Sequence, residues 1–256
     1  MTDANGHATI WAEKRKLPSA VAVLLSTSLF AMANILRLAP RRLRKQRSKR
    51  DRGKDPVSIP GDSVQCMLNE HQQMEIQRLW TRKVAQDEAG VPFSERHRNL
   101  MPASAEFLCA LASGIGARNI LEIGGSSGIS TIALAVAAKA TQGRVISLEI
   151  EPIRQAESKQ TIARLGLSDF VDFRLGDAAQ TLPELSDLEF VLIDCEKHDY
   201  IRFFDMLRMY PGGIVVADNV VSHQLGTYVA HVQSRPGAQS VTLPIGHGLE
   251  ITRVAN

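Results

Sequence analysis

The sequence predicts an α/β protein with a doubly wound, mostly parallel sheet that ends in an antiparallel hairpin. From Asn119 onward, short apolar runs typical of buried strands alternate with segments of helical periodicity. Such alternation places parallel strands side by side with helices packed on the sheet. The last two strand-like runs are separated only by Ile245–Gly248 (IGHG), a Gly-rich link that predicts a hairpin. We therefore expect one antiparallel strand at or near the sheet edge.

Seven runs are expected to form the strands of this sheet. They are 119–124, 144–150, 171–175, 189–194, 213–217, 239–244 and 249–254. Helices are expected at 130–140, at 152–165 with a proline in the first turn, around 200–210 and near 224–233. Upstream, a helical pattern begins at Ser63, with apolar residues spaced among polar ones.

The charge of the chain is unevenly distributed. Residues 1–55 hold 13 of the 30 basic side chains but only 4 of the 27 acidic ones, so the rest of the chain is acidic. The basic balance belongs to an N-terminal tail and gives no reason to expect that the body binds nucleic acid. We divide the chain into an N-terminal extension at 1–62 and a domain at 63–256. Within that domain, N-terminal helices at 63–118 precede the alternating core at 119–256.

The N-terminal extension carries an apolar segment followed by a basic run. Residues 17–36 contain no charged side chain and are about long enough to cross a bilayer. The ten basic residues of 37–54 would stay on the cytoplasmic side and suit anionic lipid. We therefore consider a membrane anchor with the body in the cytoplasm. A cleaved signal peptide and an organelle-targeting or disordered leader of a soluble protein remain open.

The first strand of the core ends in a Gly-rich turn, Glu122–Gly128 (EIGGSSG), that leads into a helix. Glycines at such a turn let a ligand approach the backbone and the free N–H groups of the helix start. A tight turn without a ligand is the plainer alternative. A short-chain dehydrogenase is disfavoured because Tyr200, Tyr210 and Tyr228 have no lysine four residues later. The turn also lacks the dinucleotide spacing G-x-G-x-x-G.

Acidic side chains follow the next two strands. Glu149 ends the second strand, and Asp177 follows the third in the run Gly176–Ala178 (GDA). A carboxylate at the end of the second strand can accept hydrogen bonds from both ribose hydroxyls of an adenosine ligand. A carboxylate after the third could accept one from an adenine amino group. Either acid alone could be a solvated strand end, but together they favour an adenosine-containing cofactor.

On these residues the chain resembles the class I S-adenosylmethionine-dependent methyltransferases. More closely, it resembles the metal-dependent O-methyltransferases typified by the catechol and caffeoyl-CoA enzymes. The resemblance covers about residues 95–256 and implies a Rossmann-like fold. The runs that carry it are Leu121–Ser130 (LEIGGSSGIS), Val145–Pro152 (VISLEIEP), Gly176–Ala178, Val191–Lys197 (VLIDCEK) and Gly213–Val220 (GIVVADNV). The last two are specific when they occur together in this order.

The resemblance implies a set of residues that bind S-adenosylmethionine, arranged along the cofactor. The set comprises Glu122 and Gly124 at the turn, Ser126 and Ser130 at the methionine end, Glu149 at the ribose, Asp177 and Ala178 at the adenine, and Asp194 beside them.

The resemblance also implies a divalent metal, Mg²⁺, held by Asp194, Asp218 and Asn219, with Lys197 as the catalytic residue. The chemistry is consistent on its own terms. Asp194 ends one strand and Asp218 follows the next, and the carboxyl ends of a doubly wound sheet share one crevice. Two carboxylates and an amide oxygen suit Mg²⁺. The metal would lower the pKa of a bound hydroxyl. Lys197 would take its proton once the metal and burial had lowered its own pKa.

The sequence therefore predicts an O-methyltransferase that acts on a small aromatic diol, a small-molecule hydroxyl acceptor. A homodimer is considered, and no nucleic-acid partner is expected. One alternative is a metal-independent O- or N-methyltransferase of the same fold. Another is a non-catalytic, membrane-tethered cofactor-binding protein. Plainer interpretations of the site also remain, in which Asp218 and Asn219 cap a loop and Lys197 lies on the surface. The short segment 220–225 replaces a longer insertion common in the family, so the acceptor stays open.

Overall fold

A computed structural model describes residues 67–255 of this chain. The apolar segment 17–36, the basic run 37–54 and the boundary at residue 62 lie outside the described residues, so the domain division and the choice between anchor, signal peptide and leader stay predictions. Between residues 67 and 255, no helix is both long and apolar enough to cross a bilayer.

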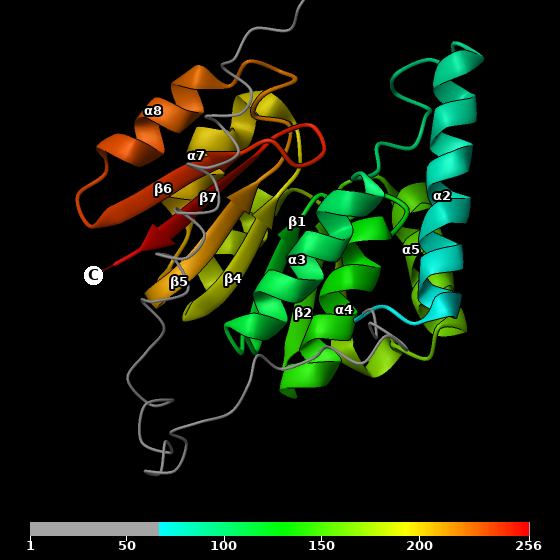
Figure 1. The fold of residues 1–256 in the computed structure, drawn as a ribbon, viewed down its shortest axis with the longest axis horizontal. Coiled ribbons are helices and arrows are strands. Elements are labelled where there is room, and N and C mark those ends of the chain that lie inside the picture. The colour runs from blue at the N-terminus through cyan, green and yellow to red at the C-terminus, as the bar shows by residue number, and fades with distance from the viewer. Residues whose placement is uncertain (1–66, 256) are drawn as a thin grey trace, which may run out of the picture. The chain divides into compact units, whose positions relative to one another are not determined.

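A seven-stranded sheet forms the centre of the described part (Figure 1). Its strands are β1 (Asn119–Ile123), β2 (Arg144–Glu149), β3 (Val171–Leu175), β4 (Leu188–Ile193), β5 (Met209–Ala217), β6 (Ala238–Leu243) and β7 (Leu249–Val254). Their order is β3-β2-β1-β4-β5-β7-β6. The first five are parallel, whereas β7 runs antiparallel to both β5 and β6. This arrangement confirms the predicted fold class and the antiparallel strand near the edge.

The helices pack in two groups, each on its own apolar core. They are α2 (Glu70–Glu88), α3 (Pro102–Gly114), α4 (Ile129–Thr141), α5 (Pro152–Arg164), α6 (Ala178–Thr181), α7 (Tyr200–Met206) and α8 (Gly226–Ser234). One core joins α2 to α5 with one face of the sheet, and the other joins α6 to α8 with the opposite face. Figure 1 shows α3 and α4 beside β1 and β2, with α8 near the β6–β7 hairpin.

The strands alternate between these two cores, as a pleated backbone requires. Phe190 and Leu192 of β4 belong to the core that contains α3 and α4, whereas Val191 and Ile193 belong to the other. Burial on both faces explains why the central strands are continuous apolar runs rather than alternating ones. It also fixes the register, because a shift by one residue would exchange the two faces.

Two element boundaries differ from the predicted ones. The first helix of the described residues, α2, begins at Glu70, where Asn69 and Gln72 form a reciprocal capping box. The helix predicted around 200–210 ends at Met206, and Met209 already pairs with Leu188 at the start of β5. Short apolar runs fit either structure, so periodicity alone could not separate the end of the helix from the following strand.

Candidate active site

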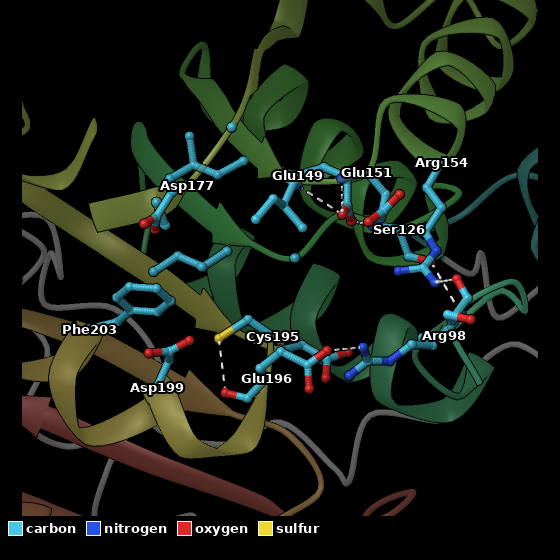
Figure 2. A pocket seen from close by; sticks show the side chains of 18 of the residues that line it. Arg98, Ser126, Glu149, Glu151, Arg154, Asp177, Cys195, Glu196, Asp199 and Phe203 are labelled. Atoms are coloured by element: carbon cyan, nitrogen blue, oxygen red, sulfur yellow. Dashed lines mark hydrogen bonds and ion pairs between the residues drawn. The ribbon is translucent and has the colours of Figure 1, made fainter. Parts of the chain in front are cut away.

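A cavity of about 310 Å³ opens at the carboxyl ends of the parallel strands (Figure 2). We call it the cofactor-side cavity. Six of the predicted cofactor residues line it: Gly124, Ser126, Glu149, Asp177, Ala178 and Asp194. Figure 2 shows Glu149 and Ser126 on one wall and Asp177 further along, so residues far apart in sequence meet in one space.

The turn after β1 requires glycine because two loops approach closely there. Gly124 has a φ of +97°, in the left-handed region. A Cβ atom at this position would lie 2.2 Å from the carbonyl oxygen of Asp194. The backbone N–H of Gly124 instead donates to the carbonyl of Leu148, 2.9 Å away. The turn therefore presents bare backbone to the cavity, as the sequence predicted.

Glu149 is buried at the end of β2 and organises this turn. Its carboxylate accepts hydrogen bonds from the backbone N–H of Ser126 at 2.7 Å and from those of Ile150 and Glu151 at 2.9 Å. A carboxylate has about four lone-pair sites, so one remains for a ligand hydroxyl. Glu149 thus both shapes the turn and faces the cavity.

Glu122 and Ser130 lie behind the turn and do not line the cavity. Glu122 is fully buried and accepts from the hydroxyls of Thr131 and Ser147 at 2.7 and 2.5 Å. Burial raises the pKa of this carboxyl, and hydrogen bonds from Ser130, Ser147 and Thr131 oppose that shift. Glu122 therefore supports the turn from inside, and Ser130 contacts it rather than the cavity.

Several residues that line the cofactor-side cavity escaped the sequence analysis. Arg98 and Phe93 come from the segment 89–99 between α2 and α3, and Arg154 comes from α5. Arg154 donates to the carbonyls of Ser94 and Arg96 at 2.9 and 3.1 Å, which fastens that segment to α5. The only sequence signal was a loop rich in arginine around one phenylalanine.

A second cavity of about 210 Å³ contains the predicted metal and catalytic residues. We call it the acceptor-side cavity. Asp194, Lys197, Asp218 and Asn219 all line it, and Asp194 also lines the cofactor-side cavity. The backbone N–H of Asp194 donates to the carbonyl of Ile123, and that of Asp218 donates to Ile193. These bonds extend the hydrogen bonding of the sheet past the strand ends. The backbone positions from which both carboxylates project are therefore fixed.

Lys197 is the centre of the polar contacts in this cavity. Its Nζ donates to Oδ1 of Asp194 at 3.0 Å, to Oδ1 of Asn219 at 2.6 Å and to the hydroxyl of Tyr200 at 2.6 Å. The Tyr200 hydroxyl in turn donates to the carbonyl of Asp218 at 3.1 Å. Burial raises the pKa of Tyr200 well above its usual range. Tyr200 therefore stays a neutral donor that orients both the lysine and the Asp218 backbone.

Asp218 is a buried carboxyl without a hydrogen-bond partner. Its side chain is 1% exposed, and neither of its oxygens has a partner among the described residues. Burial, with a contribution from the negative charge of Asp194, raises the pKa of Asp218 to about 8. An unpartnered buried carboxylate is costly, so this position suits a carboxylate that binds a cation.

The donor set fits a hard divalent cation. No group of three or more His, Cys, Asp or Glu side chains within residues 67–255 is arranged to hold a metal. The predicted set has two such side chains, and its third member is the amide of Asn219. Two carboxylate oxygens and an amide oxygen are ligands that Mg²⁺ accepts, with other positions left for water or substrate.

One histidine, His247, orients the side chain of Asn219. His223 and His247 line the acceptor-side cavity, whereas the His198 side chain is 78% exposed. Burial lowers the pKa of His247, which favours the neutral ring. Its Nδ1 lies 3.2 Å from Nδ2 of Asn219. That contact directs the amide oxygen of Asn219 toward Lys197.

The family model described as O-methyltransferase matches residues 71–245, which include all the strands that form this site. The chain belongs to the O-methyltransferase family. It is 38% identical over 141 residues to a catechol O-methyltransferase from Niastella koreensis, covering 52% of this chain and 62% of that protein. It is 38% identical over 120 residues to the Mycobacterium tuberculosis catechol O-methyltransferase, covering 45% of this chain and 54% of that one. The matches thus span less than two thirds of these two relatives.

Solved structures of the family share this architecture. The O-methyltransferase from Bacillus cereus, in complex with SAH, is 25% identical with a TM-score of 0.61, covering 71% of this chain and 90% of that one. Cofactor-bound Rv0187 from MTB is 27% identical with a TM-score of 0.59, and the match covers 70% of this chain and 91% of that one. These neighbours confirm the Rossmann-like methyltransferase fold that the sequence predicted.

Proposed function

We propose that this protein is an S-adenosylmethionine-dependent O-methyltransferase that methylates a hydroxyl of a small aromatic diol, with assistance from Mg²⁺. The observation that carries the proposal is that Asp194 lines both cavities, so the two cavities adjoin at this residue. Methyl transfer requires the acceptor oxygen and the methyl group to meet in line, so donor and acceptor sites must adjoin. Family membership and the SAH complex of the Bacillus cereus protein support S-adenosylmethionine as the methyl donor.

The cofactor would occupy the cofactor-side cavity. Glu149 would accept a hydrogen bond from the ribose, Asp177 and Ala178 would border the adenine, and Ser126 would lie at the methionine end. Ser130 would act only indirectly, through its contact with Glu122.

Replacing Glu149 with alanine is expected to weaken S-adenosylmethionine binding by about 1–3 kcal/mol. The variant loses the ribose contact and leaves three backbone N–H groups of the turn without an acceptor. Calorimetry measures the affinity. The matched control is Glu189→Ala, which removes a carboxylate that accepts from the backbone N–H groups of Arg118 and Asn119 at the other end of the sheet. Equal affinities in both variants would contradict the assignment.

Asp194, Asp218 and Asn219 would hold the metal. When bound, the metal supplies a Lewis acid that lowers the pKa of the acceptor hydroxyl and holds its oxygen in place. Lys197 in its neutral form would accept the hydroxyl proton at Nζ. The oxygen lone pair then forms the new bond to the methyl carbon while the carbon–sulfur bond breaks and its electron pair stays on sulfur. Tyr200 would keep Lys197 aimed at that oxygen.

Two contacts of Lys197 favour a second candidate, a metal-independent methyltransferase. The Nζ atom of Lys197 lies within hydrogen-bond distance of Asp194 and Asn219, two of the three expected metal ligands. A lysine ammonium in that place could bind the acceptor oxygen by itself.

The metal requirement separates the two candidates. With Mg²⁺ and catechol, we expect S-adenosylhomocysteine to form, and excess EDTA to reduce the rate to background until Mg²⁺ is restored. Full activity in EDTA would establish the metal-independent enzyme instead. Binding of S-adenosylmethionine without turnover of any diol would favour a non-catalytic cofactor-binding protein.

A further inference from the structure

The acceptor-side cavity contains cations that the proposed methyl transfer does not use. Lys83 of α2 lines it together with Arg96 and Arg98 of the segment 89–99. Among the described residues that line it, Phe93 is the one apolar side chain. Pockets for small molecules are usually lined mainly by apolar and aromatic side chains, with a few polar groups. The lining therefore points to an acceptor that carries charge.

Lys83 and Arg96 share a single carboxylate, that of Asp87. The Nζ atom of Lys83 lies 2.6 Å from Oδ2, and Nη1 of Arg96 lies 2.8 Å from Oδ1. These contacts lower the pKa of Asp87, so it stays negative near neutral pH. Two cations against one anion leave a net positive charge. In addition, Nε of Arg96 is buried without a hydrogen-bond partner.

An exposed aromatic ring lies beside these cations. Phe93 is 55% exposed, and the guanidinium groups of Arg98 and Arg96 lie 4.4 and 5.4 Å from its ring centroid. Arg98 also pairs with Glu196 (Figure 2). Arg154 anchors the backbone of this segment at Ser94 and Arg96. An aromatic acceptor could contact Phe93 while its charged group meets the cations.

These cations lie close to the residues proposed to hold the metal. Lys83 and Arg96 line the same cavity of about 210 Å³ as Asp194, Asp218 and Asn219. A molecule that reaches Asn219 is therefore within range of these cations.

We propose that the acceptor is an anionic catechol, with a carboxylate on the ring or on a short side chain, and that Lys83 and Arg96 bind that carboxylate. This inference rests on the proposed function. Acids and bases in or against the cavity are equal in number: Lys83, Arg96, Arg98 and Lys197 against Asp87, Asp194, Asp218 and Glu196. A divalent cation would leave the site positive. A catechol that binds the metal as a monoanion and also carries a carboxylate supplies two negative charges, which restores neutrality. A catechol without the carboxylate supplies only one.

The test compares protocatechuate with its neutral carboxamide, which has nearly the same shape. Calorimetry in the presence of Mg²⁺ and S-adenosylhomocysteine gives Kd for each, and turnover gives kcat/KM. We expect the carboxylate to bind roughly tenfold more tightly, as a partly exposed charge-assisted contact allows. Lys83→Gln and Arg96→Gln should each reduce that preference severalfold and leave the carboxamide unaffected. The control is Arg78→Gln, which removes a cation from the same helix at a position that does not line this cavity.

The outcomes separate the inference from the proposed function. Equal affinity and equal turnover of the two compounds would overturn the inference while methyl transfer itself stands. An equal loss of preference in Arg78→Gln would also overturn it, because the effect would then come from overall charge. If neither compound is methylated, the proposed function fails. Calorimetry alone then decides the inference, and a carboxylate preference that Lys83→Gln and Arg96→Gln abolish supports it.

Discussion

Replacing Asp218 with asparagine is expected to reduce methyl transfer about 10³-fold and to leave the fold intact. A catalytic metal supplies several kcal/mol of charge stabilisation, and removing one of only two carboxylate ligands should forfeit most of it. The amide has nearly the shape of the carboxyl, so packing is preserved. Turnover at saturating Mg²⁺ measures the loss. Asp205→Asn is the matched control, because Asp205 is a half-exposed acid paired with Arg235 and His231.

The stability of this variant tests whether Asp218 has a structural role. Its pKa is about 8 in the folded chain, against an ordinary value of 3.8 for an aspartate. The folded state therefore retains a proton that the unfolded state releases, so this carboxyl destabilises the metal-free protein as pH rises between those values. Asp218→Asn has no carboxyl at this position and lacks this pH-dependent destabilisation. In EDTA, the Tm of Asp218→Asn relative to that of the wild type should therefore increase from pH 5 to pH 8. A variant several degrees less stable at pH 8 would show instead that Asp218 supports the fold.

Replacing Lys197 with alanine is expected to lower kcat by roughly 10²–10⁴, the usual range for a general acid–base group. The side chain contacts Asp194, Asn219 and Tyr200 but does not line the cofactor-side cavity. Affinity for S-adenosylmethionine should therefore change less than twofold, while single-turnover kinetics show slow chemistry. Lys159→Ala is the control, since Lys159 lies on α5 over the ring of Phe173, outside both cavities.

Two results would contradict this role for Lys197. An unchanged kcat would make the lysine a bystander that only offsets the charge of Asp194. A large loss of cofactor affinity with unchanged chemistry would make it a structural support for the loop after β4. Alanine also leaves Asp194 and Asn219 without their cation, so Mg²⁺ affinity measured in parallel should not fall if these residues bind the metal directly.

The sequence by itself determined the order and type of the core elements. Runs such as 119–123 and 188–193 are largely apolar because both sheet faces are covered, and that burial is visible in composition alone. The Gly-rich link at 245–248 likewise predicted the β6–β7 hairpin. The polar residues at strand ends could be assigned to one site, since parallel strands place their carboxyl ends together. Glu149 and Asp177 were predicted in this way, and the resemblance to the O-methyltransferases added Asp194 and Asp218.

Only the tertiary structure decided which side chains meet. Ser130 is close to Ser126 in sequence, yet it points behind the turn to Glu122, because helix α4 rotates it away from the cavity. Lys83 and Arg96 belong to segments with no strand-end signal. Both line the acceptor-side cavity, Lys83 from α2 and Arg96 from the segment 89–99, which Arg154 fastens to α5. Such contacts depend on packing between distant segments, which local periodicity does not encode.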